Sequence, residues 1–244
     1  MRNPALFLVL CMILWSCTPK SDNKNSSEEH GHSHADGSED VHADASSLDK
    51  ESVEFKDPFI VQASENSPEF LQHASGVKII ENIADFETKV GIETQEGYFG
   101  PLLFGGELRT FFIVLHPGQF LAEHAHAIES IVYTVSGKWV LCSEGNRQVM
   151  KPGTLFHFGN DKPTGWEAPF NEEAHLLVFK KRTPDQNYES YMAGLADMQV
   201  MMDEEMEKGM TLWYHQIGPE HPARQFAAQV NPDFDQLIEK LESR

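Results

Sequence analysis

The stretch Gly118-Gln-Phe-Leu-Ala-Glu-His124-Ala-His126-Ala-Ile-Glu-Ser-Ile-Val-Tyr-Thr-Val-Ser-Gly137 decides the fold of this chain. A glycine turn opens it, two histidines follow at alternate positions, and a β-branched run leads to a second glycine. Residues i and i+2 of a strand project from the same face. His124 and His126 are therefore expected to point the same way, as two ligands of one metal ion or two acid–base groups of one cavity would.

The same pattern of short β-forming runs separated by turns extends over residues 58–182. Short runs rich in β-branched and aromatic residues alternate there with glycine and proline turns. Many short strands at a spacing of roughly ten residues are typical of a β-sandwich or a small barrel. We expect strands at residues 76–80, 109–115, 131–135, 139–142, 148–150, 154–158 and 174–179.

Residues 183–244 are expected to form a helical extension that packs on the barrel. Thr183-Pro184 fits an N-cap followed by a first helical proline, and Gly209 fits a helix stop. A stripe of large side chains lies between them at a spacing of three to four residues: Tyr188, Met192, Leu195, Met198, Met202 and Met206. Such a stripe favours packing on a core, with Cu(I) binding by thioethers as the rarer alternative. Two shorter helices are expected at residues 222–230 and 232–241.

Residues 1–17 have the pattern of an export signal. Arg2 precedes a run of roughly ten apolar residues, which is too short to span a bilayer. Leu14-Trp15-Ser16-Cys17 resembles a bacterial lipobox, and this resemblance implies cleavage before Cys17 and diacylglycerol on its sulfur. Trp15 is larger than the small residue usual there, so an ordinary secretory signal is the alternative. Thr18 after the cysteine favours the outer membrane by the same resemblance.

Residues 18–57 are polar and hold few large apolar side chains. Such a segment cannot offset its chain entropy by burial, so we expect a disordered tether between lipid and domain. Four of the chain's 12 histidines lie in it, among aspartates: His30, His32, His34 and His42. This composition can bind Zn²⁺, Ni²⁺ or Cu²⁺ weakly, but we favour the interpretation that the segment is a solvated linker with incidental histidines.

The charge of the chain and the motifs that it lacks exclude some classes of partner and cofactor. The formal net charge is −19, from 38 acidic and 19 basic side chains, which argues against nucleic acid as a partner. A glycine-rich phosphate loop is missing, so no nucleotide cofactor is expected.

With Cys11 in the signal and Cys17 lipidated, Cys142 stands alone and no internal disulfide is expected. Its strand-like surroundings favour a small buried side chain over a nucleophile.

Residues 110–180 resemble the cupin family, within a domain of about residues 100–182. Gly118, His124 and His126 match the family's first motif, a glycine followed after five residues by His-x-His. The run from Gly145 to Pro152-Gly-Thr resembles the front half of the second motif, with six residues before the proline instead of five. The resemblance implies an all-β, double-stranded β-helix (jelly-roll) barrel. It also implies one divalent transition metal ion, Fe, Zn, Ni or Mn.

The ligand set implied by the resemblance is incomplete. The family's glutamate falls at Ser130 and its downstream histidine at Thr164, and hydroxyls are poor ligands for divalent transition metals. Glu129 is one position early, so it would face away from His124 and His126 unless a bulge follows the second histidine.

Other side chains offer replacements. His157 lies on an expected strand and would supply a third nitrogen, so the expected ligands are His124, His126, Glu129 and His157. His116 and His175, on flanking strands, are further candidates, and each of these three added histidines is also explained as a hydrogen-bonded part of the barrel wall. If the barrel holds a small molecule, its expected contacts are Ser130, Tyr133, Phe156, Thr164 and Trp166.

Three functions remain in competition. We favour a lipid-anchored module that binds a small molecule in a barrel with an eroded metal site. The second is a metalloenzyme, an oxygenase or isomerase that uses His124 and His126. The third is a metal buffer that uses the histidine-rich tether. A homodimer is an open alternative for the assembly.

Overall fold

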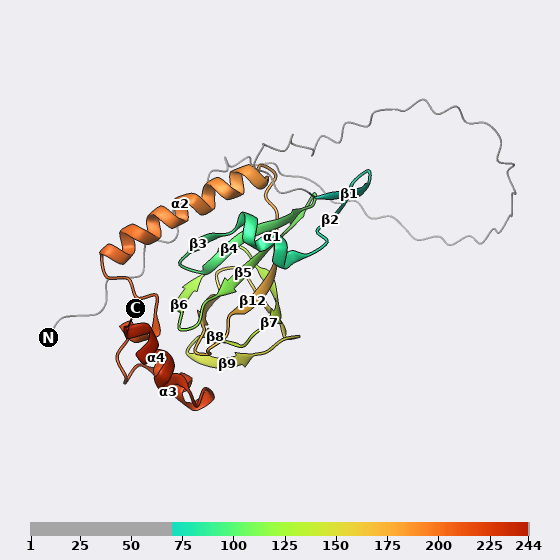
Figure 1. Cartoon of the computed structure of the whole chain (residues 1–244). Helices are drawn as coiled ribbons and strands as arrows, with labels where there is room; N and C mark the ends of the chain where they lie inside the picture. Colours follow the sequence, from blue (N-terminus) through green and yellow to red (C-terminus); the bar gives the residue numbers. More distant parts are fainter. Residues whose placement is uncertain (1–69, 244) are drawn as a thin grey trace, which may run out of the picture. The chain divides into compact units, whose positions relative to one another are not determined.

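The computed structural model describes residues 70–243 (Figure 1). The expected signal peptide with Cys17, the tether with His30, His32, His34 and His42, and residues 58–69 of the expected barrel lie outside the described residues. In the described part, no helix is both long and apolar enough to cross a membrane.

The described elements, in chain order, are β1 (Leu71–Ala74), β2 (Val77–Ile79), α1 (Ile83–Val90), β3 (Ile92–Thr94), β4 (Gly97–Phe104), β5 (Leu108–Leu115), β6 (Phe120–Ala125), β7 (Ser130–Ser136), β8 (Trp139–Ser143), β9 (Asn146–Met150), β10 (Leu155–Phe158), β11 (Pro163–Glu167), β12 (Ala174–Lys181), α2 (Tyr188–Glu207), the 3₁₀ helix η1 (Tyr214–Gln216), α3 (Pro222–Val230) and α4 (Phe234–Glu242).

Two antiparallel sheets form the barrel. The larger has six strands in the order β10-β7-β12-β5-β4-β3, and the smaller has four in the order β6-β11-β8-β9. Their inner faces bury one apolar core, to which both sheets contribute large side chains, among them Phe111, Ile113, Val132, Trp139, Trp166 and Leu176. The expected jelly-roll barrel with a helical C-terminal extension is confirmed.

A β-bulge in β6 sets the direction of the histidines. Thr164 of β11 pairs with His124, whereas Trp166 pairs with Leu121, so β6 holds one extra residue between these two pairs. A bulge of this kind reverses the alternation of the strand on one side of it. His124 faces the barrel interior as a result, while Phe120, four residues earlier, faces outward.

Gly165 allows this bulge to form. A Cβ atom at this position would lie 2.9 Å from the backbone nitrogen of Glu123 and 2.9 Å from the backbone oxygen of Leu121. Real Cβ atoms essentially never approach backbone so closely, so only glycine fits opposite the bulge without displacing it.

The outward-facing Phe120 anchors the C-terminal helices. It packs in a second buried cluster with Tyr214 and with α3 and α4. The hydroxyl of Tyr214 donates a hydrogen bond of 3.0 Å to the carboxylate of Glu167, which is 1% exposed and also pairs with Arg147 at 3.0 Å. The extension is therefore fastened to the four-stranded sheet by an apolar contact and by a buried, partnered carboxylate.

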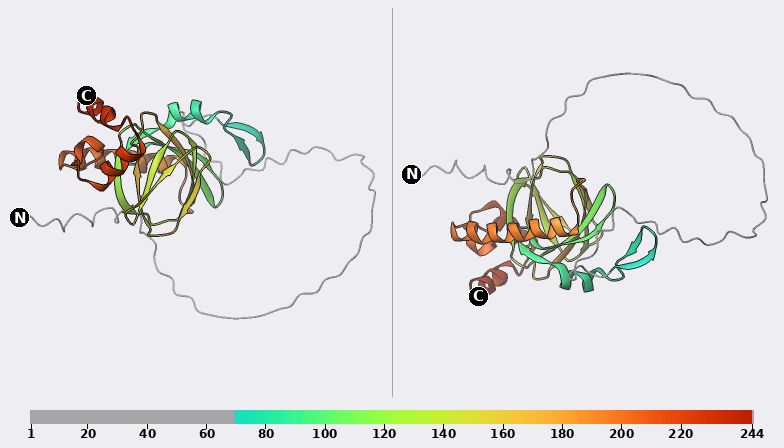
Figure 2. Two further views of the ribbon diagram at one scale, coloured as in Figure 1. Left: turned by 90° about the horizontal axis from the view of Figure 1, so that it is seen from below. Right: turned by 90° about the horizontal axis from the view of Figure 1, so that it is seen from above.

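Helix α2 lies across one end of the barrel (Figure 2). Tyr191 and Leu195 are buried in the barrel core, and Met192 and Met198 pack against it, so the first half of the expected stripe is core packing. The helix starts at Tyr188, not after Thr183. Asn187 caps it instead, because its side chain accepts a hydrogen bond of 2.9 Å from the backbone of Ser190.

Cys142 is a buried thiol, in agreement with expectation. Burial and a hydrogen bond of 2.8 Å to the Glu123 carboxylate raise the pKa of the thiol to about 12. It is therefore protonated at neutral pH and is a poor nucleophile.

We expect Gly165→Ala to destabilise the protein by about 1–3 kcal/mol, because the added methyl group overlaps backbone at the bulge. Chemical denaturation monitored by circular dichroism measures the loss in the free energy of unfolding. Gly159→Ala is the matched control, since its nearest neighbour lies 3.9 Å from the added carbon. Equal stabilities of the two variants would contradict the role assigned to Gly165.

Candidate metal centre

His124 and His126 lie next to each other at the edge of the barrel interior. Their ring centroids are 4.4 Å apart. Both rings are half-buried, and that of His126 also lies 4.7 Å from the ring of Phe158. The expectation that the two histidines share a face is confirmed.

Glu96 completes a cluster with the two histidines. It lies in the turn between β3 and β4, and its carboxylate approaches Nε2 of His124 to 3.6 Å. One potential ligand atom from each of Glu96, His124 and His126 lies within 4.8 Å of the other two, the only such group of three or more among residues 70–243. Two imidazoles and one carboxylate are the donor set of the facial triad that holds non-haem iron and related ions.

The spacing of Glu96 and His124 and the orientation of His124 suit a metal ion. Two ligands bound at about 2.1 Å from one ion lie roughly 3.0–3.4 Å apart, so the 3.6 Å gap between Glu96 and His124 needs only a small adjustment. Nδ1 of His124 lies 3.1 Å from the backbone oxygen of Ala122, to which it can donate. This bond leaves Nε2 directed at the cluster, in the arrangement by which proteins orient metal-ligating histidines.

Thr164 supports the cluster from the neighbouring strand. Its hydroxyl forms a hydrogen bond of 2.9 Å with Nε2 of His126 and accepts one of 3.2 Å from the indole nitrogen of Trp166. The position at which the cupin resemblance expects a fourth ligand therefore reaches the cluster, but it offers a hydroxyl that holds His126 in place.

The charges of the three groups differ. Burial alone would raise the pKa of the Glu96 carboxyl, but His124, His126 and Lys180 outweigh burial and lower it to about 2. Burial opposes charge on His124 as well, and the Glu96 carboxylate outweighs it, so the pKa of His124 is raised. The pKa of His126 is lowered to about 4, chiefly by burial. Without metal, one imidazolium thus faces one carboxylate beside a neutral imidazole.

Glu129 and His157 are not part of this cluster, which corrects the expected ligand set. Both side chains lie on the outer face of the barrel, 62% and 56% exposed, and they pair with each other at 3.2 Å. The bulge that could have turned Glu129 inward is absent after His126, because the bulge of β6 lies before His124. Glu129 lies in the bend between β6 and β7 and directly precedes the inward-facing Ser130. His157 lies on β10 between the inward-facing Phe156 and Phe158.

The expected ligand-contact residues also divide between the two faces. Ser130 is buried and faces inward, and its hydroxyl has no hydrogen-bond partner within residues 70–243. Tyr133 faces outward and is 37% exposed, so it cannot line the interior. Trp166 and Phe156 both pack on Trp139 and fill the core rather than border a cavity.

His116 and His175 lie in a chain of ion pairs on the outside of the barrel. His116 is 3.0 Å from Glu93 and 3.1 Å from Glu173. His175 is 3.1 Å from Glu87, whose carboxylate raises the pKa of the imidazole. Because Glu93 and Glu173 approach opposite nitrogens of His116, these groups do not converge on one point as metal ligands would.

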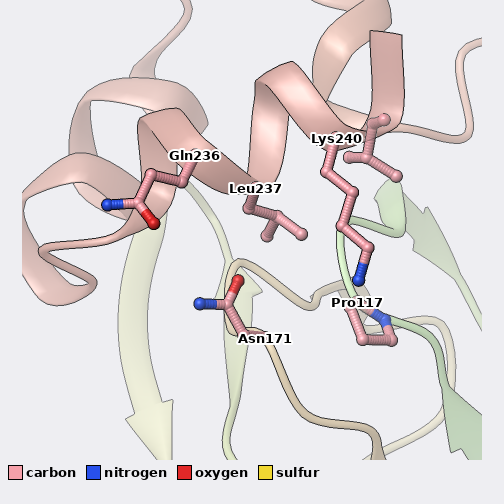
Figure 3. A pocket seen from close by; sticks show the side chains of 6 residues that line it. Pro117, Asn171, Gln236, Leu237 and Lys240 are labelled. Carbon is pink, nitrogen blue, oxygen red and sulfur yellow. The ribbon is translucent and has the colours of Figure 1, made fainter. Parts of the chain in front are cut away.

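Two hollows lie outside the barrel core, next to the C-terminal helices. One, of about 230 Å³, lies between α4 and the loops at Pro117 and Asn171 (Figure 3). The other is lined by residues of α2, η1 and α4, namely Met206, Trp213, His215, Gln216 and Leu241. The barrel core itself contains large aromatic side chains, among them Trp139, Phe158 and Trp166.

Glu96 was missed from the sequence because the hairpin that carries it was missed. Strands β3 and β4 lie outside the stretch that resembles the cupin motifs, and β4 contains glycine and proline, which weaken a strand pattern. The available signal was the alternating run Ile92-Glu-Thr followed by Gln-Glu-Gly97, a turn sequence between two β-forming segments.

The fold and site define a jelly-roll barrel with a histidine and carboxylate cluster at one end. Residues 111–180 match the family model described as the cupin domain, and the chain contains a cupin domain there. Cupin domains often bind a divalent metal, and Glu96, His124 and His126 form a candidate site for one. No curated protein matches the chain.

The chain is similar to several solved structures. An RmlC-like cupin from Shewanella frigidimarina is 20% identical over 36% of this chain and 78% of its own, with a TM-score of 0.32. A cupin 2 conserved barrel domain protein from Salinispora arenicola is 14% identical over 50% of this chain and 97% of its own, with a TM-score of 0.38. The polyketide cyclase RemF from Streptomyces resistomycificus is 15% identical over 45% and 86%, with a TM-score of 0.34.

In the metal-free protein, we expect the two histidines to titrate separately. His126 should stay neutral until the pH falls to about 4, whereas His124 should remain protonated above the ordinary range of histidine. ¹⁵N-detected NMR of the imidazoles measures both. Glu96→Gln should lower the pKa of His124, because burial then acts without the opposing carboxylate. Titration of both histidines at the ordinary value would contradict the burial and pairing described here.

Proposed function

We propose that the protein is a metal-dependent cupin, in which Glu96, His124 and His126 bind one divalent transition metal ion. The observation that carries the proposal is the convergence of these three ligands within 4.8 Å at one end of the barrel. The carboxylate that the cupin motifs lack is supplied by the hairpin between β3 and β4. The proposal differs from the expectation of an eroded site because it takes the missing carboxylate from Glu96.

The site is suited to act on a small oxygenated organic molecule. Three protein ligands leave positions open for a substrate, and a bound metal would supply Lewis acidity or an activated water there. The protein's own groups prepare the centre: Glu96 is ionised, the backbone of Ala122 orients His124, and Thr164 fixes His126. An oxygenase or isomerase is the enzyme class that this arrangement favours.

A binding module without metal is the second candidate. It is favoured by the interactions within the cluster, which give its polar groups partners without a metal ion. Glu96 pairs with His124, and Thr164 forms a hydrogen bond with His126. This alternative predicts that the barrel takes up no metal and that ligand binding does not depend on one.

The proposal includes export and attachment to the outer membrane through a lipid on Cys17. Its support is the lipobox-like sequence Leu14-Trp-Ser-Cys17 after a short apolar run. Mass spectrometry of the mature N-terminus should find diacylglycerol on Cys17, and an unmodified N-terminus would contradict the anchor.

Metal content tests the proposed centre. The experiment uses a full-length variant in which serine replaces the four tether histidines, His30, His32, His34 and His42. These substitutions remove metal binding by the tether. After incubation with Mn²⁺, Fe²⁺, Ni²⁺ or Zn²⁺, elemental mass spectrometry should find about one equivalent of a bound ion. Glu96→Ala or His124→Ala should weaken the binding of this ion at least tenfold, because each removes a ligand.

His157→Ala is the matched control, since His157 also pairs with a glutamate but lies on the outer face. It should bind metal as the parent protein does. Metal uptake that survives Glu96→Ala and is lost in His157→Ala would contradict the proposed centre. Uptake that disappears with the tether histidines alone would favour the metal buffer instead.

A further inference from the structure

A row of three polar side chains faces the barrel interior on adjacent strands of the six-stranded sheet. Arg109 of β5 pairs with Lys180 of β12, and Lys180 pairs with Ser130 of β7. Arg109 is 3% exposed and Ser130 is 2% exposed. The next inward-facing layer is apolar and consists of Phe111, Val178 and Val132. The row therefore forms a polar layer at one end of the barrel core.

This row adjoins the candidate metal centre. Phe158 of β10 pairs with Ser130, and its ring lies 4.7 Å from the ring of His126. The charge of Lys180 acts on Glu96 and on both histidines of the cluster. The cationic row and the metal ligands thus border the same part of the barrel.

Ser130 indicates that a further group belongs in this space. Its Oγ is buried and has no hydrogen-bond partner within the described residues. Buried hydroxyls in folded proteins are nearly always bonded to protein, to water or to a ligand. The hydroxyl faces the same interior as Lys180, so a group bound there would contact both.

The chemistry of the row selects an anion. A guanidinium presents a planar fork of donors that matches a carboxylate, and an ammonium and a hydroxyl add donors without a fixed plane. The ring of Tyr191, 4.8 Å from the guanidinium carbon of Arg109, packs against the guanidinium from the α2 side. A divalent ion bound at Glu96 would add positive charge nearby, where low polarity strengthens the attraction for an anion.

We propose that Arg109, Lys180 and Ser130 form a carboxylate-binding subsite next to the metal centre, so that the ligand of this barrel is a small organic acid. This inference rests on the metal-dependent function proposed above, because it places a second oxygen group of the same ligand at the metal. It assigns a binding role to Arg109 and Lys180, which lie outside the cupin motifs, and to Ser130, which stands where the first motif has its glutamate.

Succinate and its neutral analogue succinamide test the subsite. Calorimetric titration of the full-length, metal-loaded protein should show binding of succinate and at least tenfold weaker binding of succinamide. Lys180→Gln should weaken succinate binding at least tenfold and leave the metal content unchanged. Lys181→Gln is the matched control, because Lys181 is the next residue of β12 and is exposed on the opposite face.

Ser130→Ala is a second test variant that should leave the fold intact, because the hydroxyl it removes makes no hydrogen bond in the described fold. It should also weaken succinate binding. Equal binding of succinate and succinamide, or of Lys180→Gln and the parent protein, would overturn the subsite even where metal binds. Tighter binding of inorganic phosphate than of succinate would overturn the choice of a carboxylate. Succinate binding through Lys180 in a protein that takes up no metal would support the subsite and contradict only the metal centre.

Discussion

The bulge of β6 opposite Gly165 is the local constraint on which both the site and the helical extension depend. It allows one short strand to face outward at Phe120 and inward at His124. On the outer side, Phe120 packs against the C-terminal helices, and on the inner side the histidines meet Glu96. An unbulged strand would place Phe120 and His124 on the same face, so one of the two contacts would be lost.

The barrel encloses a polar end within an otherwise aromatic core. Glu96, His124 and His126 cluster there, the charge of Lys180 acts on Glu96, and Arg109 lies against the ring of Tyr191 of α2. Buried charges are tolerated when they face an opposite charge, as Glu96 and His124 do here at 3.6 Å. Neighbouring positions deeper in the core are apolar, which confines the polar chemistry to one end. The site therefore forms because adjacent strands place their charged residues at the same end of the barrel.

The fold was predictable from local pattern, and the candidate site only in part. Alternating strands, glycine turns and the His-x-His spacing predicted the barrel and the shared direction of His124 and His126. Glu96 escaped because its partners are distant in sequence, and a single chain gives no signal of pairing between a hairpin turn and a remote strand. The misplacement of His157 has the opposite cause: it was assigned by residue type, whereas strand alternation puts it outside.

The position of a bound metal ion tests the centre most directly. Crystals of the protein grown with Zn²⁺ give anomalous differences at the zinc absorption edge, which locate the ion independently of any activity. We expect a peak within bonding distance of Glu96, His124 and His126. A peak at the outer Glu129–His157 pair, or a Zn²⁺-soaked barrel without a peak among those three side chains, would contradict the proposed centre.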